Sequence, residues 1–487
     1  MTKRVSRKIG LTKGWRIAGI IAAVLTAAAA VCFTVVMANL GVLPKKYMIV
    51  ILVVIWIVTV LVCEIQFFRR MKIPSKILAA ILIVILIIGS CVSSRLIKVM
   101  NTASNVTTSV DTVQVYVLND DPAETINDAE DYQFGILASL DRENTDEARE
   151  SIEETLETEL SVTEYESMID LANALLDGEI GAILVNSAYI NTVDEDDSLS
   201  DFPDNIRVLT SYDIERELEI AGDDDDEEDD DILSPFIVYI SGNDASGSLK
   251  ATGRSDVNIL MAVNPKTHTV LLVNTPRDYY VELAGIGAYD KLTHAGIYGV
   301  DVSMNTLGNL YDVSVKYYVR MNFTGFVEIV DALGGIMVES EYAFTVGEYE
   351  FGEGTNYLDG EAALAFARER YSFSSGDRQR GKNQMAVITA VIKKLTSTAL
   401  LTGYSDIMDA AADSMETNLT QAQIAELVQY QLEYGGSWTV ETISADGTGG
   451  MTSVYSMPSS NLYVMYPDED IVAEIKEKLK EVLSEEE

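Results

Sequence analysis

Arginine is concentrated in one short segment of the part of the chain after residue 100, which is otherwise strongly acidic. Residues 368–382 contain five basic residues, four of them arginines, and Asp377 lies among them. An arginine fork binds two phosphate oxygens at once and stays charged at any relevant pH. A solvated basic face is the simpler explanation, but it is not expected by chance where basic residues are so few. The segment therefore predicts a site for a phosphate group.

Three further polar groups lie next to segments that read as strands. They are Ser241-Gly242-Asn243-Asp244, Gly253-Arg254-Ser255-Asp256 and Thr275-Pro276-Arg277-Asp278, and the last is followed by Lys291-Leu292-Thr293-His294-Ala295-Gly296. The ends of strands are where α/β proteins place ligand contacts. Each group alone has a simpler explanation: a turn cap for Asp244, a local ion pair for Arg254 and Asp256, and a packed imidazole for His294. Taken with the arginine segment, two carboxylates suit a pyrophosphate and a divalent metal, because Mg²⁺ takes one or two carboxylates plus phosphate oxygens.

An α/β domain from residue 233 to 487 is expected to position these groups. Its expected strands are 235–241, 257–263, 270–273, 315–321 and 438–443, and its expected helices are 304–310, 325–333, 360–368, 384–400, 419–431 and 468–483. This order of elements predicts a mixed central sheet covered by helices on its faces.

A smaller α/β domain is expected at residues 105–222. Strands are predicted at 113–118, 134–138, 180–185 and 206–209, and helices at 146–160 and 164–176. This region has no arginine pair and no cluster of catalytic residue types, so an accessory or interaction module is expected. Nine consecutive acids follow at 223–231, which repel one another and predict a solvated linker at 223–232. The run lacks the spaced glycine of a calcium-binding loop.

Three apolar runs in the first hundred residues are each long enough to cross a bilayer core, which takes about 20 helical residues. Transmembrane helices are expected at about 17–43, 47–68 and 77–95. Basic residues gather in the tail before the first span and between the second and third, which predicts that both lie in the cytoplasm. Three crossings then place everything after about residue 98 outside the cell.

The distribution of charge also separates the first hundred residues from the rest of the chain. Residues 1–100 hold 14 basic residues and one acid, Glu64, whereas the remainder holds 21 basic and 75 acidic residues. A strongly acidic exterior argues against nucleic-acid binding, which calls for a basic surface. The three cysteines, Cys32, Cys63 and Cys91, all fall in the apolar runs. The exterior region therefore depends on an ordinary hydrophobic core rather than on disulfides.

Taken together, these blocks resemble the LytR–CpsA–Psr family of cell-wall glycopolymer ligases. The resemblance covers about 236–465 and includes the polar groups above, the Arg368-Glu369-Arg370-Tyr371 block and the Asp377-Arg378-Gln379-Arg380-Gly381 block. The three spans and the accessory domain look like the capsule-associated branch found in streptococci. The resemblance implies a phosphotransferase of the bacterial cell membrane. Its donor would be a polysaccharide on a polyprenyl pyrophosphate, its acceptor peptidoglycan, and its product a phosphodiester.

The resemblance also implies residue roles. Asp244 and Asp256 would hold Mg²⁺ or Mn²⁺. The pyrophosphate would be bound by Arg277, Arg368, Arg370 and Arg380, with Arg254, Lys291 and Gln384 lining the same site. Asp278 and Asp377 are candidates for the acceptor base, but an arginine-orienting role is favoured for both. A lipid tail needs an apolar slot; Phe326, Ile329 and Leu333 could line one, although ordinary core positions are favoured.

Two other functions fit the same residues. A hydrolase would cleave the lipid pyrophosphate with water in place of the sugar hydroxyl. A non-enzymatic regulator of capsule synthesis would bind the lipid and signal through the spans, although the cytoplasmic segments leave no room for a DNA-binding domain. The polymer is expected to be capsular polysaccharide, with a teichoic-acid-like polymer as the alternative.

Overall fold

The structure is a computed structural model that describes residues 13–68, 71–196, 198–220, 231–243, 251–397, 406–410 and 414–484. The predicted acidic linker, apart from residues 231–232, lies outside these described residues. The predicted metal ligand Asp244 also lies outside them.

Three long helices form from the three apolar runs. They are α1 (Lys13–Leu40), α2 (Lys45–Ile65) and α3 (Pro74–Ala103). Each is long and apolar enough to cross a membrane, and most of their large apolar side chains are exposed rather than packed in a core. Pro44 precedes α2 and Pro74 begins α3, where a missing backbone N–H costs nothing. These three helices form one compact unit with α14 (Gln421–Tyr434). Within this unit, Glu433 of α14 lies 3.8 Å from Lys46 of α2.

The accessory domain is built on a five-stranded sheet with the order β3-β2-β4-β1-β5. The strands are β1 (Thr108–Leu118), β2 (Gln133–Leu137), β3 (Ser161–Tyr165), β4 (Ala182–Asn186) and β5 (Ile206–Glu217), and the main helices are α4 (Arg142–Leu156) and α5 (Met168–Leu176). The helix predicted at 164–176 ends at the predicted residue, but it begins four residues later than predicted. The first residues of the predicted helix belong to β3, and the Ser167 hydroxyl then accepts a hydrogen bond from the Asp170 N–H and starts α5 there.

The larger domain has a six-stranded mixed sheet in the order β16-β11-β6-β7-β8-β17. Its strands are β6 (Phe236–Asn243), β7 (Val257–Asn264), β8 (Thr269–Asn274), β11 (Tyr317–Asn322), β16 (Met415–Thr417) and β17 (Thr439–Ser444). The parallel pairs are β6 with β11 and β8 with β17, whereas β7 runs antiparallel to both of its neighbours. The mixed sheet predicted from the order of elements is confirmed.

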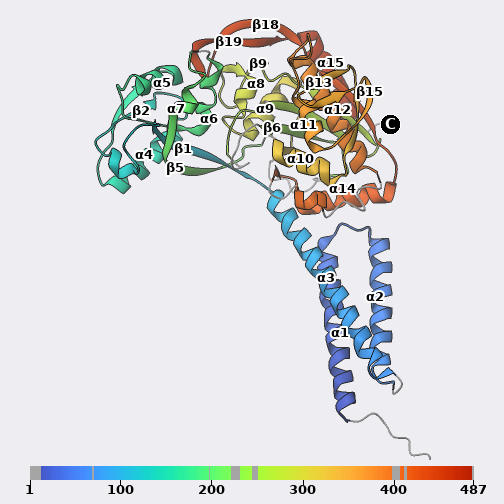
Figure 1. Ribbon diagram of the computed structural model, residues 1–487. Helices are drawn as coiled ribbons and strands as arrows, with labels where there is room; N and C mark the ends of the chain where they lie inside the picture. Colours follow the sequence, from blue (N-terminus) through green and yellow to red (C-terminus); the bar gives the residue numbers. More distant parts are fainter. Residues whose placement is uncertain are drawn as a thin grey trace, which may run out of the picture. The chain divides into compact units, whose positions relative to one another are not determined.

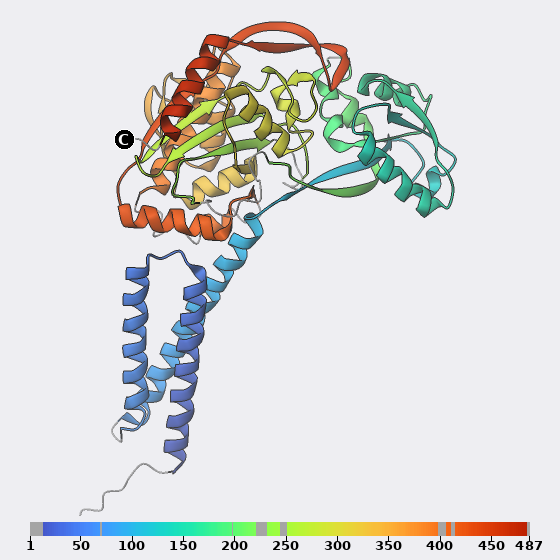
Figure 2. The same cartoon turned by 180° about the vertical axis from the view of Figure 1, so that it is seen from behind.

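Helices cover both faces of this sheet, as the alternation of side chains along a strand requires. In β7, Leu260 and Ala262 pack on one face with α9 (Val300–Tyr311) and α15 (Glu469–Leu483). Ile259 and Val263 point to the other face, toward α12 (Asp377–Leu395). Beside α12 lie α10 (Phe323–Ala332) and α11 (Gly360–Arg368). Figure 1 looks onto α11 and α12, and the reverse view in Figure 2 looks onto α15.

Short strands complete the larger domain, and none of them was predicted. β12 (Ile336–Ser340) pairs with β15 (Gly354–Leu358), β13 (Phe344–Val346) with β14 (Tyr349–Phe351), and β9 (Tyr280–Glu282) with β10 (Tyr289–Lys291). The hairpin of β18 (Gly447–Val454) and β19 (Met457–Pro467) reaches the accessory domain, where Ser460 lies 3.1 Å from Asp196.

Candidate functional site

The predicted polar groups meet at one edge of the six-stranded sheet. Since β6 and β8 both run opposite to β7, their C-terminal ends lie beside the N-terminal end of β7. Asp256 comes immediately before β7, and Arg277 follows β8 by three residues. Asp256 and Arg277 are 21 residues apart in the sequence, but the sheet topology brings them together.

A pocket of about 820 Å³ opens at this edge. Predicted site residues that line it are Arg254, Asp256, Arg277, Arg368, Arg370, Arg380 and Gln384. Five of these seven are arginines. The four predicted polar segments therefore contribute to a single pocket, apart from the part of the first segment that lies outside the described residues.

Arg277 and Asp256 form the central ion pair of the pocket. An Nη of Arg277 donates to Asp256 Oδ1 at 2.8 Å. Burial opposes ionisation of Asp256, but the charge of Arg277, with Arg380 and Arg254 behind it, outweighs burial and holds the pKa of Asp256 below its usual range. Burial likewise opposes the charge of Arg277, but Asp256 and Asp278 overcome it and raise the Arg277 pKa further. Among the described residues, the buried Nε of Arg277 has no hydrogen-bond acceptor, so a ligand oxygen would satisfy it.

Three of the other arginines lie on or just after two helices. Arg368 is the last residue of α11, and its guanidinium lies over the Phe323 ring at 4.4 Å. Arg370 lies two residues beyond the end of α11 and donates to the Tyr371 hydroxyl at 2.7 Å. Arg380 lies in the first turn of α12, which begins seven residues before the helix predicted at 384–400. Placed on one helix, Arg380 and Gln384 are four residues apart and share a face.

Close packing of α12 on the sheet depends on Gly381. A side chain at this position would collide with Asn274 at the end of β8. Glycine therefore lets the first turn of α12 approach the strand end that also carries Arg277. Burial and the nearby Arg277 lower the pKa of Arg380, although Asp377 opposes this shift.

Three predicted site residues, Asp278, Lys291 and Asp377, are not among the residues that line the pocket. They contact residues that do line it, or one another. Lys291 and Asp278 are paired at 2.7 Å, and Asp278 lies 4.0 Å from Arg277. Asp377 forms an ion pair with Arg380, three residues along α12. Both carboxylates are thus engaged with cations, which agrees with the orienting role favoured above.

Two pocket residues were missed by the sequence analysis, because the accessory domain was expected to carry none. Asp194 and Glu195 lie in the 3₁₀ helix η3 (Val193–Glu195) of that domain and line the pocket. Asp194 contacts Arg254 at 3.0 Å, and Glu195 contacts Lys291 at 2.9 Å. The acidic stretch at 194–197 was the available signal, but nothing in the sequence pairs it with basic residues 60 to 100 positions away.

The rest of the pocket is apolar. Its walls come from β7, β11 and the helices α10, α11 and α12. Phe326 and Ile329 are among the lining residues, and they also belong to the core: Ile329 is buried in it and Phe326 packs against it, as favoured above. Leu333 lies in the core beside them, as favoured. The pocket thus joins a cationic mouth to an apolar interior.

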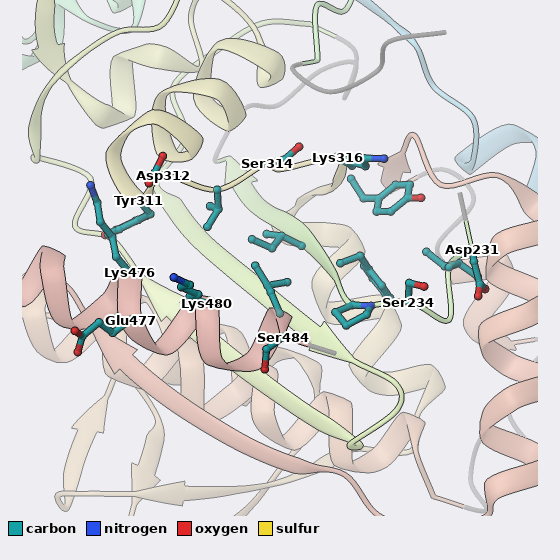
Figure 3. A pocket seen from close by; sticks show the side chains of 17 residues that line it. Asp231, Ser234, Tyr311, Asp312, Ser314, Lys316, Lys476, Glu477, Lys480 and Ser484 are labelled. Atoms are coloured by element: carbon teal, nitrogen blue, oxygen red, sulfur yellow. The ribbon is translucent and has the colours of Figure 1, made fainter. Parts of the chain in front are cut away.

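A second pocket, of about 730 Å³, lies on the other face of the domain, between α15, the start of β6 and the segment before β11. Figure 3 shows Lys476 and Lys480 on α15 with Lys316 across the opening. Asp231, Asp312 and Glu477 lie among the lining residues, so the charges are balanced. None of the predicted site residues is among those the structure places along it, and it is not the candidate site.

Fold and site together define an α/β domain that carries an arginine-lined pocket in a chain with three long apolar helices. The family model described as LytR_cpsA_psr family matches residues 210–481, more than half of the chain. The protein therefore belongs to this family, and the resemblance stated above is confirmed.

Curated relatives carry the name polyisoprenyl-teichoic acid–peptidoglycan teichoic acid transferase TagU. The protein from Bacillus anthracis is 40% identical over 194 residues, which cover 40% of this chain and 63% of that protein. The Halalkalibacterium halodurans protein is 35% identical over 250 residues, which cover 50% of this chain and 78% of that protein. Among solved structures, Bacillus subtilis TagU has a TM-score of 0.42 at 32% identity, covering 52% of this chain and 99% of that chain.

Proposed function

We propose that this protein is a membrane-anchored phosphotransferase that attaches a polyprenyl-pyrophosphate-linked glycopolymer to peptidoglycan through a phosphodiester. One observation carries the proposal. Five arginines, with the carboxylates of Asp194, Glu195 and Asp256, line the charged part of a pocket whose remaining walls are mostly apolar. A ligand that matches both parts has a multiply charged phosphate group joined to a long hydrocarbon chain. The names of the relatives support the same class of reaction.

The arginines would bind the pyrophosphate and stabilise the charge that develops on it. In the transfer, a peptidoglycan hydroxyl forms a bond to the phosphorus that carries the glycan. The bond from this phosphorus to the bridging oxygen breaks, polyprenyl phosphate leaves, and the proton of the hydroxyl goes to the leaving phosphate. Arg277 is placed for this role, because it is held by Asp256 and still has a buried Nε directed to no acceptor among the described residues. Fixed cations of this kind lower the barrier without needing to reorganise.

The metal is part of the proposal. The structure describes no group of three or more His, Cys, Asp or Glu residues that could hold a metal ion. One ionised carboxylate in the pocket, Asp256, fits Mg²⁺, which completes its coordination with phosphate oxygens and water. Asp256 would hold the ion together with Asp244, which lies outside the described residues. When bound, Mg²⁺ would neutralise charge on the pyrophosphate.

Placement at the membrane follows from the charge of the connections. The tail before α1 and the connection between α2 and α3 are basic, so we place both in the cytoplasm and the larger domain outside the cell. This orientation places the pocket on the side where peptidoglycan is assembled. The three-span layout favours a capsular polysaccharide as the polymer, whereas the names of the relatives favour a teichoic acid. Donors carrying either polymer can be compared in one assay.

The apolar part of the pocket gives the sharpest test of the donor class. Ala367 lines the pocket from α11, and Ala367→Trp is expected to fill the space that the polyprenyl chain requires. Burial of one CH₂ contributes about 0.8 kcal/mol, so excluding only two carbons weakens binding roughly tenfold. Binding of a long-chain polyprenyl pyrophosphate by the full-length protein in detergent should therefore weaken at least tenfold, while a short-chain pyrophosphate is unaffected.

The matched control is Glu361→Trp, which places the same side chain on the exposed face of the same helix. It should leave both affinities unchanged. Equal binding of the long-chain lipid by wild type and Ala367→Trp would show that the chain does not enter this pocket, and the proposed donor would be wrong.

A further inference from the structure

The accessory domain contributes a carboxylate that three cationic side chains of the larger domain share. Glu195 contacts an Nη of Arg254 at 3.1 Å, Nζ of Lys291 at 2.9 Å and Nε2 of His294 at 3.3 Å. Its side chain is 13% exposed. Burial opposes ionisation of Glu195, but His294 and Lys291 outweigh burial and hold the pKa of Glu195 far below its usual range.

Each of the three cations also has a carboxylate of its own. Arg254 contacts Asp194 at 3.0 Å, Lys291 contacts Asp278 at 2.7 Å, and His294 contacts Asp290 at 2.7 Å. Glu195 is the one carboxylate among these four that contacts all three cations. It therefore fixes the cations relative to one another, which none of the separate pairs does.

His294 anchors this arrangement from behind. The imidazole is completely buried, and its Nδ1 lies 2.7 Å from Asp290 and 2.8 Å from the Ser456 hydroxyl. Burial disfavours the imidazolium, but Asp290 and Glu195 outweigh burial and raise the pKa of His294 to about 9. A charged His294 holds Glu195 in place, so this carboxylate cannot turn away from the pocket without leaving a buried charge unpaired.

Other contacts between the accessory domain and the larger domain lie away from the pocket and hold the two domains together. Arg216 of β5 forms two hydrogen bonds, at 2.8 and 2.9 Å, with the buried carboxylate of Asp301. The Thr252 hydroxyl donates to Asp111 of β1 at 2.9 Å. The two domains therefore present Glu195 to the pocket as part of one packed unit.

We propose that Glu195 is a positioning residue of the transferase site, supplied by the accessory domain to hold Arg254 where it meets the donor pyrophosphate, with Lys291 and His294 fixing the Glu195 carboxylate from behind the pocket. The inference rests on the proposed function. Without the Glu195 carboxylate, Arg254 keeps only the contact with Asp194, whose side chain is 43% exposed, so the Arg254 guanidinium is less tightly fixed. Ordering Arg254 when the donor binds then costs side-chain entropy. The accessory domain is accordingly one wall of the site and not a separate module.

Steady-state transfer by the full-length protein in detergent separates positioning from folding. Glu195→Gln keeps the size of the side chain but removes its charge, and it is expected to raise the KM for the lipid pyrophosphate at least tenfold while leaving the KM for the peptidoglycan fragment unchanged. A merely structural role would reduce the fraction of folded enzyme, which lowers kcat and leaves both KM values unchanged. Asp196→Asn is the matched control, because Asp196 is adjacent and contacts Ser460 across the same junction without lining the pocket.

A second readout does not depend on activity. The chain has two histidines, so ¹³C-labelled histidine gives one resonance each for His268 and His294. We expect His294 to titrate near pH 9 in the wild type and at a clearly lower pH in Glu195→Gln, with Asp196→Asn unchanged.

The outcomes separate the inference from the proposed function. An active wild type whose donor KM is the same in Glu195→Gln, or a His294 titration that does not move, overturns the inference and leaves the proposed function standing. No transfer by the wild type overturns the proposed function and this inference with it.

Discussion

Arg277→Ala should lower the rate of glycopolymer transfer by about 10²–10³-fold, the loss typical when one preorganised donor to a developing charge is removed. Arg277 follows β8 at the edge where the pocket opens, and its guanidinium is fixed by Asp256 at 2.8 Å. A methyl group at this position can neither bind a phosphate oxygen nor carry charge. The rate is measured with the full-length protein, the lipid-linked glycan and peptidoglycan fragments.

Two further variants make this result specific. Arg277→Lys keeps the charge without the fork and should retain part of the activity. Arg149→Ala removes an arginine from an ion pair on α4 of the accessory domain and should leave the rate unchanged. Arg277→Ala is expected to remain folded, because Arg380 and Arg254 still face Asp256, and thermal unfolding checks this. Full activity in a folded Arg277→Ala protein would contradict the assignment of this site.

Glu416→Ala should have the largest effect on stability, a loss of about 3–5 kcal/mol, because it leaves Arg320 buried without its counter-ion. Arg320 of β11 and Glu416 of β16 are cross-strand partners, and Arg320 Nε lies 2.7 Å from Glu416 Oε1. Both side chains are 5% exposed. The free energy of unfolding is measured by denaturant titration of the full-length protein.

An exposed ion pair provides the comparison. Lys382 and Glu341 lie 3.4 Å apart, and both side chains are about half exposed. Glu341→Ala should cost less than about 1 kcal/mol, as exposed pairs usually do. The double variant Arg320→Met with Glu416→Leu should recover most of the stability lost by Glu416→Ala, since replacing both charges leaves neither unpaired. Equal losses for the buried and the exposed variant would contradict this account of Arg320.

Strand β11 shows why an arginine in the sequence does not by itself mark the ligand site. Side chains alternate along β11, so Val319 and Met321 line the pocket while Arg320 points to the opposite face. The sequence places all three in one strand and does not distinguish a ligand-binding arginine from a structural one. Burial with a carboxylate partner makes that distinction.

Local signals predicted much of the fold. The helix expected at 360–368 has those bounds, because Asp359 caps its first turn and its small residues pack on one side. The helix expected at 384–400 begins earlier, at Asp377. Polar residues fill its first two turns, so the apolar periodicity that marks a helix starts only later. Pairing order within the six-stranded sheet depends on contacts between distant segments, which periodicity does not encode.

Local patterns also predicted some residues of the candidate site and not others. Motifs in the larger domain predicted seven residues that line the pocket: Arg254, Asp256, Arg277, Arg368, Arg370, Arg380 and Gln384. Glu195 could not be predicted, because its role depends on how the accessory domain packs against Lys291 and His294. No pattern within 105–222 indicates that contact. Residues brought together only by domain packing are beyond the reach of local sequence patterns.

The most direct test of the proposed function is to find which product contains the phosphorus that carries the glycan in the donor. Full-length protein in detergent is mixed with a polyprenyl-pyrophosphate-linked glycan, Mg²⁺ and peptidoglycan fragments, and the products are identified by mass spectrometry. The proposed function predicts a glycan joined to peptidoglycan by a phosphodiester, formed only with Mg²⁺ and lost in Arg277→Ala. Free phosphorylated glycan without an adduct, or intact lipid bound to the protein, would contradict it and favour a hydrolase or a lipid-binding regulator instead.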